Sequence, residues 1–106
     1  MKRILILGGS GFLGKNLNKV FNDSEYIICN ESRKTDCDIL DINKLTLKIK
    51  DFNPHFIINA AAHVGSIAYV STYSADVCND NTQMYLNIFK AIHTVNSEIV
   101  LINQLL

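Results

Sequence analysis

Apolar residues in this chain fall into two alternating patterns. Short runs of leucine and β-branched residues, at 3–7, 26–29, 55–62 and 98–102, are typical of buried β-strands. Between these runs, apolar residues recur at the spacing of one helix face. The three stripes consist of Leu13, Leu17, Val20 and Phe21; of Ile42, Leu45, Ile49 and Phe52; and of Val77, Met84, Tyr85, Ile88, Phe89, Ile92 and Val95. The predicted order is therefore strand, helix, strand, helix, strand, helix, strand.

This alternation predicts an open α/β sheet. A crossover helix must bury its apolar stripe on the sheet, so short connections favour parallel strands covered by helices. We expect residues 1–106 to form the N-terminal half of a Rossmann-like doubly wound parallel sheet, with strand order 3-2-1-4 and helices on both faces. The long irregular stretch at residues 63–73 is where a binding loop is expected.

Composition and charge exclude several classes of protein. The 106 residues suit one domain or part of one, and an apolar fraction of 48% fits a globular protein. Ten basic and ten acidic residues are scattered and give a formal net charge of zero, which argues against nucleic-acid binding. The apolar run at residues 4–7 is too short for a signal peptide or a membrane span. We therefore expect a cytoplasmic protein without a membrane partner.

The cysteines favour neither a disulfide framework nor a structural zinc site. Cys29, Cys37 and Cys78 are odd in number and form no C-x-x-C pair. We expect three reduced thiols that serve as packing or loop residues, and we expect no bound metal.

The segment GGSGFLGKN, residues 8–16, fits two kinds of phosphate-binding loop. From Gly9 to Lys15 it is close to the loop of a nucleotide triphosphatase. That loop continues with a Ser or Thr whose hydroxyl binds magnesium, and this chain has Asn16 instead. The triphosphatase interpretation is therefore the weaker of the two.

A dinucleotide-binding turn needs a strand, a glycine turn and a helix N-terminus that faces a pyrophosphate, and the sequence predicts all three here. Gly8 or Gly9 would permit the tight turn. Gly11 would let the backbone approach the phosphate, and Gly14 would let the helix touch the strand. The sequence therefore favours a bound dinucleotide.

Together with the glycines, three further stretches resemble the extended short-chain dehydrogenase/reductase family, the NAD(P)-dependent epimerases, dehydratases and reductases of nucleotide sugars. The stretches are DILD at 38–41, NAAAHVG at 59–65, and the helix positions of Asn81, Asn87 and Ala91. Residues 60–76 are most similar to the GDP-L-fucose synthases. That branch reduces and epimerises a GDP-linked 4-keto-6-deoxy sugar with NADPH.

The resemblance implies a cofactor site along the carboxyl ends of the strands. The first Asp of DILD would meet the adenine amino group, and the alanine-rich turn would leave room for a ligand lying across the sheet edge. The loop after the third strand would touch the substrate. The predicted cofactor residues are Gly8, Gly11, Phe12, Leu13, Gly14, Asn30, Arg33, Asp38, Ile39, Ala60, Ala61 and Ala62, and the predicted substrate residues are His63, Val64 and Gly65.

The choice between NADP and NAD is expected about twenty residues beyond the glycines. Members specific for NAD usually place Asp where this chain has Asn30, and Arg33 with Lys34 offers positive charge for a 2′-phosphate. Glu31 argues in the other direction, because an acidic side chain accepts a hydrogen bond from the 2′-hydroxyl of NAD. We expect NADP, with NAD as the alternative.

The resemblance also implies catalytic groups that this chain lacks. The family uses a tyrosine with a lysine four residues later, and none of Tyr26, Tyr69, Tyr73 and Tyr85 has that lysine. We therefore assign no catalytic residue and expect a partial NAD(P)-binding domain, without the catalytic half or the substrate domain. A nucleotide sugar is the expected substrate of the completed enzyme, and self-association is expected of the uncovered sheet. A non-catalytic NADP(H)-binding module is the alternative.

Overall fold

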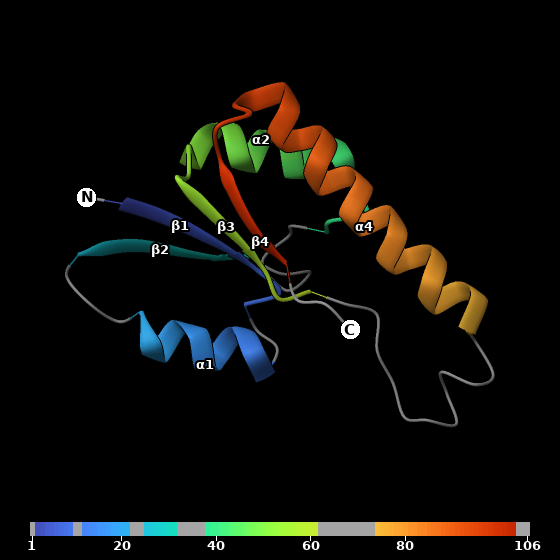
Figure 1. The fold of residues 1–106 in the computed structure, drawn as a ribbon, viewed down its shortest axis with the longest axis horizontal. Helices are drawn as coiled ribbons and strands as arrows, with labels where there is room; N and C mark the ends of the chain where they lie inside the picture. Colours follow the sequence, from blue (N-terminus) through green and yellow to red (C-terminus); the bar gives the residue numbers. More distant parts are fainter. Residues whose placement is uncertain (1, 10–11, 22–24, 32–37, 62–73, 104–106) are drawn as a thin grey trace.

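The computed structural model of the chain describes residues 2–9, 12–21, 25–31, 38–61 and 74–103. Within these residues, strands and helices alternate in the predicted order (Figure 1). The elements are β1 (Lys2–Leu7), α1 (Phe12–Val20), β2 (Tyr26–Glu31), α2 (Ile42–Phe52), β3 (Phe56–Asn59), α4 (Ser74–Val95) and β4 (Val100–Asn103).

The predicted parallel sheet is confirmed, but the predicted strand order is not. The strands lie in the order β2-β1-β3-β4, not 3-2-1-4, because β3 pairs with the opposite side of β1 from β2. The crossovers through α1 and α2 therefore run in opposite directions across the sheet. Since such crossovers are right-handed, opposite directions place the helices on opposite faces. Figure 1 shows this arrangement, with α1 on one face and α2 and α4 on the other.

Two apolar layers enclose the sheet, and the larger lies under α2 and α4. Alternate residues of β1 serve the two layers, as the period of two in a strand requires. The larger layer comprises Leu5, Leu7, Ile39, Leu45, Ile49, Ile57, Met84, Ile88, Ala91, Ile92 and Ile99. The smaller layer comprises Ile4, Ile6 and Ile58, packed by Leu17, Phe21, Tyr26, Ile28 and Phe56.

Helix α2 has well-defined ends. The side chain of Asp41 accepts hydrogen bonds from the backbone N–H groups of Asn43 and Lys44, at 3.1 and 3.2 Å, so it caps the helix N-terminus. At the other end Asn53 adopts a left-handed conformation, with φ of 50°, and donates its N–H to the carbonyl of Ile49. The second Asp of the DILD stretch therefore has a structural role.

Several predicted details are wrong. Strand β2 continues to Glu31, beyond the predicted end at residue 29, because it stays paired with β1 as far as Leu7.

Two apolar residues of the predicted helix stripes are not buried. Val20 and Phe89 lie in predicted apolar stripes, yet they are 74% and 53% exposed. Val20 is the last residue of the short helix α1, where Leu17 and Phe21 make the contact with the sheet. Phe89 follows Ile88, so it is turned by about 100° from the buried face of α4.

Candidate functional site

The carboxyl ends of the paired strands lie at one edge of the sheet. Leu7 is paired with Glu31 on one side and with Asn59 on the other, and Asn59 is paired with Asn103. The glycine turn after β1 and the alanines after β3 therefore leave the sheet side by side. This is the edge at which open α/β sheets bind ligands.

Gly8 is packed against the backbone of the alanine turn. Its φ is +78°, and a Cβ at this position would lie 2.7 Å from the backbone nitrogen of Ala61 and 2.8 Å from the carbonyl carbon of Ala60. Side chains rarely tolerate that φ, and backbone atoms cannot easily move away. Only glycine therefore fits where the two turns meet.

Gly14 holds the same turn from the helix side. A Cβ on Gly14 would meet the carbonyl oxygen of Gly8 and come within 2.5 Å of the Cα of Gly9. The close contact between helix and turn that the sequence predicts is present. Because of it, the first turn of α1 starts directly beside the end of β1.

The carbonyl of Glu31 already occupies two N–H groups of the glycine turn. It accepts hydrogen bonds from the backbone nitrogens of Gly8, at 2.8 Å, and Gly9, at 3.2 Å. Among the described residues, the start of α1 offers further N–H donors, since the first N–H groups of a helix have no intrahelical partner. An anion at this edge would therefore meet the positive end of α1, which begins at Phe12.

Asn30 and Glu31 point to opposite sides of β2, as neighbours in a strand do. The side chain of Asn30 lies against Gly9, because a Cβ on Gly9 would come within 2.5 Å of Asn30 Oδ1. The side chain of Glu31 faces α2. Asn30 is thus the β2 side chain that touches the glycine turn.

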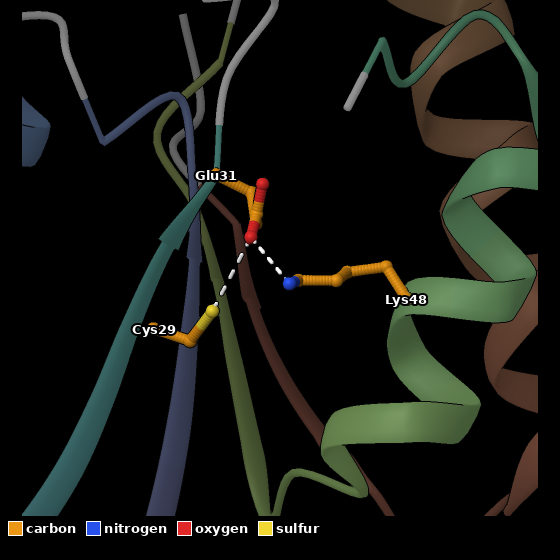
Figure 2. A network of polar contacts seen from close by, with 3 residues as sticks. All are labelled: Cys29, Glu31 and Lys48. Atoms are coloured by element: carbon orange, nitrogen blue, oxygen red, sulfur yellow. Dashed lines mark hydrogen bonds and ion pairs between the residues drawn. The ribbon is translucent and has the colours of Figure 1, made fainter. Parts of the chain in front are cut away.

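Figure 2 shows the contacts of the Glu31 carboxylate, which is buried between β2 and α2. Its Oε1 atom lies 2.5 Å from Lys48 Nζ and accepts a hydrogen bond from Cys29 Sγ at 3.4 Å. The hydrogen bond to Glu31 raises the pKa of Lys48, so the lysine stays charged at neutral pH. Burial, and then the bond to Glu31, raises the pKa of the Cys29 thiol, which keeps it protonated.

The turn at residues 38–41 is held by a buried amide. Asp38 Oδ1 accepts from the backbone N–H of Leu40 at 3.0 Å, which closes a local turn. Asn87 Nδ2, on α4, donates to the carbonyl of Ile39 at 2.8 Å, and Asn87 Oδ1 accepts from Gln83 at 2.8 Å. The side chain of Ile39 is in the core, so only its backbone remains for contact with a ligand.

A second buried amide organises the turn after β3. Asn59 is 1% exposed; its Oδ1 accepts from the backbone N–H of Ala61 at 3.1 Å, and its Nδ2 donates to Asn103 at 3.3 Å. The amide thus joins the ends of β3 and β4 and orients the alanine turn. In addition, the backbone N–H of Ala60 donates to the carbonyl of Leu7 at 2.8 Å.

The structure brings together most of the predicted cofactor residues that it describes. The residues that form the glycine turn or touch it are Gly8, Gly14, Asn30, Ala60 and Ala61. Phe12 and Leu13 are in the first turn of α1, which follows it. Asp38 and Ile39 form the separate turn that Asn87 holds. The other predicted site residues lie outside the described part of the chain: Gly11, Arg33, Ala62, His63, Val64 and Gly65.

Sequence reasoning did not assign two residues of this edge. Asn59 could have been recognised as a polar residue at the inner end of an apolar strand, where a buried amide must find partners. Lys48 carried no such signal, because its contact with Glu31 depends on how α2 lies over β2.

Catalytic and metal-binding groups are not found in the described residues. Neither Tyr26 nor Tyr85 has a lysine four residues on, and no cluster of three His, Cys, Asp or Glu side chains could hold a metal ion there. Cys29 and Cys78 are free thiols, and Cys37 lies outside the described residues. No helix in the described ranges is long and apolar enough to cross a membrane.

Comparisons with known proteins agree with this architecture. Residues 4–103 match the profile of the NAD dependent epimerase/dehydratase family. The chain is 32% identical over 89 residues to a GDP-L-colitose synthase of Yersinia pseudotuberculosis, covering 84% of this chain and 29% of that protein.

Solved structures include similar folds. A dTDP-4-dehydrorhamnose reductase from Bacillus anthracis in complex with NADP has a TM-score of 0.80 and 27% identity, over 90% of this chain and 34% of that one. A GDP-L-fucose synthetase from Naegleria fowleri bound to NADP shares the fold, with a TM-score of 0.78 and 23% identity, over 96% of this chain and 33% of that one. The chain thus spans about a third of the length of these relatives.

Proposed function

We propose that this chain, which belongs to the NAD dependent epimerase/dehydratase family, holds the adenosine and pyrophosphate of a nicotinamide dinucleotide, with NADP preferred to NAD. The completed protein would be a reductase or epimerase of a nucleotide-linked sugar, similar to the GDP-L-fucose synthases. Its substrate would contact His63, Val64 and Gly65.

One observation carries this proposal: the glycine turn, the alanine turn and the start of α1 meet at the carboxyl edge of a parallel sheet. Gly8 is in contact with the backbone of Ala60 and Ala61, and Gly14 is in contact with the turn itself. These backbones lie too close together for a side chain at Gly8 or Gly14. A pyrophosphate at this place would meet the N–H groups and the positive end of α1.

The adenosine would lie toward the turn at residues 38–41. Asp38 accepts a hydrogen bond within its local turn, and it is the carboxylate of this turn proposed to accept from an adenine amino group as well. Two relatives with the same fold were solved with NADP. For this chain, Arg33 is the residue proposed to bind the 2′-phosphate, because a guanidinium binds phosphate in a bidentate manner.

The chemical step is assigned to residues that these 106 do not provide. Proton transfer in the family needs a tyrosine with a lysine four residues on, and no tyrosine of the chain has one. The function proposed for this chain is therefore to bind and orient the cofactor.

Calorimetric titration with NADPH, NADH and magnesium-ATP tests the proposal. We expect NADPH to bind most tightly, Gly11→Val to lose dinucleotide binding, and Arg33→Ala to weaken NADPH much more than NADH. Absence of dinucleotide binding to the wild-type chain would refute the proposed function. ATP binding that is lost in Lys15→Ala would favour a triphosphatase instead.

A further inference from the structure

The acidic residue at the end of β2 is the feature that bears on cofactor choice. In dinucleotide-binding sheets a carboxylate near this place accepts from the ribose 2′-hydroxyl of NAD, and its charge repels the 2′-phosphate of NADP. Glu31 is the last residue of β2, and its carbonyl is bonded to Gly8 and Gly9. Its backbone is therefore beside the turn that would hold the cofactor.

The Glu31 side chain does not lie on the side of β2 that touches the glycine turn. It faces α2 together with Cys29 (Figure 2). Asn30, by contrast, lies against Gly9. The side chain of Glu31 is only 9% exposed, while that of Lys48 is 35% exposed. Lys48 thus reaches in from the surface to the buried carboxylate.

We propose that Lys48 is a specificity-determining residue that makes this site compatible with NADP, because it holds the Glu31 carboxylate against α2 and neutralises its charge. The inference rests on the proposed function, since it concerns the same dinucleotide site. Lys48 would thus influence the choice of cofactor from a helix that does not itself touch the ligand, in addition to the 2′-phosphate contact proposed for Arg33.

The electrostatics of the pair support this role. Without the ion pair to Lys48, the buried carboxylate would be less well compensated, and turning toward water or a hydrogen-bond donor would lower its free energy. Because Glu31 is the last residue of β2, its released carboxylate would turn toward the carboxyl edge of the sheet. There it would accept from a 2′-hydroxyl and repel a 2′-phosphate.

The test is the ratio of the dissociation constants for NADPH and NADH in charge variants of the pair. In Lys48→Met, which keeps the apolar stem and removes the charge, we expect affinity for NADPH to fall at least about tenfold relative to NADH. The double variant Lys48→Met with Glu31→Gln should regain the wild-type ratio, because the released charge is gone. Lys48→Arg preserves the ion pair, so its ratio of dissociation constants should equal that of the wild type.

Glu31→Gln alone gives a second test that leaves Lys48 in place. We expect its ratio to stay within about twofold of the wild type, since the carboxylate is already held away from the ribose. A selective loss of NADH affinity in Glu31→Gln would overturn the proposal, because it would place the carboxylate on the ribose. An unchanged ratio in Lys48→Met, or an equal loss for both dinucleotides, would overturn it as well.

These outcomes are distinct from failure of the proposed function. If the wild-type chain binds neither dinucleotide, the proposed function and this inference both fall. If the wild-type chain binds NADPH, but the ratio of dissociation constants is unchanged in Lys48→Met, only the role of Lys48 in cofactor selectivity is refuted. Circular dichroism of each variant verifies that the ratio is measured on folded protein.

Discussion

Asn87, in the middle of α4, donates a 2.8 Å hydrogen bond to the backbone carbonyl of Ile39, which is 48 residues away in the sequence. This bond connects the long helix to the turn proposed to meet adenine. Asn87 is 4% exposed, so water is not available to replace this hydrogen bond. A side chain that looks like an interruption of the apolar stripe therefore positions part of the candidate site.

We predict that Asn87→Leu lowers the free energy of unfolding by about 1–3 kcal/mol, because the carbonyl of Ile39 would remain buried without its donor. Urea denaturation measures this change. Gln83→Leu is the matched control, since it removes only the more exposed partner of the same amide and should cost less than about 0.5 kcal/mol. Equal losses in the free energy of unfolding would show that the hydrogen bond to Ile39 stabilises the chain no more than the one to Gln83.

Gly8→Ala should destabilise the chain by about 2–4 kcal/mol, through backbone strain together with overlap with a neighbouring turn. The φ of Gly8 is +78°, and the new methyl group would meet backbone atoms of Ala60 and Ala61. Because these contacts are with backbone, adding Ala61→Gly should not restore stability. Rescue by Ala61→Gly in thermal denaturation would mean that the obstruction is a side chain and that the described turn geometry is wrong.

The core predicted from sequence can be tested on two leucines of α2. Leu45 is fully buried, whereas Leu47 is 60% exposed. We expect Leu45→Ala to cost about 2–5 kcal/mol and Leu47→Ala less than about 0.5 kcal/mol, as measured by chemical denaturation. Similar costs would contradict the orientation of α2 on the sheet.

His55 predicts a pH-dependent stability at the opposite edge of the sheet. Its Nδ1 accepts the backbone N–H of Arg3 at 3.0 Å. Desolvation, and then the charges of Arg3 and Lys2, lowers the pKa of His55 below its ordinary value of 6.5. The unfolded chain therefore binds the proton more tightly. The contribution of His55 to folding stability is therefore fully present above its pKa in the unfolded chain. It is lost as the pH falls through that value toward the lower pKa in the folded chain.

His55→Asn separates this effect from other acid-induced changes, because Asn Oδ1 can accept the same N–H and does not titrate. We expect the melting temperature of His55→Asn to fall less than that of the wild type between about pH 7.5 and 5.5. His93→Asn, on the exposed end of α4, is the control and should follow the wild type. Identical pH profiles of all three proteins would exclude His55 as the cause.

Self-association remains a prediction, and the exposed side chains of β4 indicate where the contact would form. Among the described strands β4 lies at the sheet edge, and Val100 and Ile102 are 49% and 50% exposed. Ile102→Lys should reduce association in sedimentation velocity, because a charge at an edge disfavours pairing. Val20→Lys, at an exposed position on α1, should not. A wild-type chain that is monomeric at every concentration would contradict this prediction.

The sequence predicted those features that depend on local pattern. Alternating apolar runs and stripes identified the order of elements, and the glycine spacing placed the contact of Gly14 with the turn, since only local sterics are involved. The strand order was wrong because the direction of a crossover depends on which side of β1 accepts β3, which the apolar pattern of β3 does not encode.

The polar contacts of the site could not be predicted for a related reason. Glu31 with Lys48, and Asn87 with Ile39, are pairs brought together by the rotation and tilt of a helix over the sheet. In the sequence Lys48 looks like any exposed lysine on a helix, and Glu31 looks like a ribose-binding carboxylate. Only the tertiary packing shows that the two side chains neutralise each other.

Amide NMR of the labelled chain during titration with NADPH shows directly whether a dinucleotide binds at the glycine turn. We expect chemical-shift changes at the carboxyl edge, for Gly8, Gly9, Gly14, Asp38, Ile39 and Ala61, and none at the opposite edge, for His55 and Val100. Unchanged spectra at saturating NADPH, or changes centred on His55, would contradict dinucleotide binding at the glycine turn.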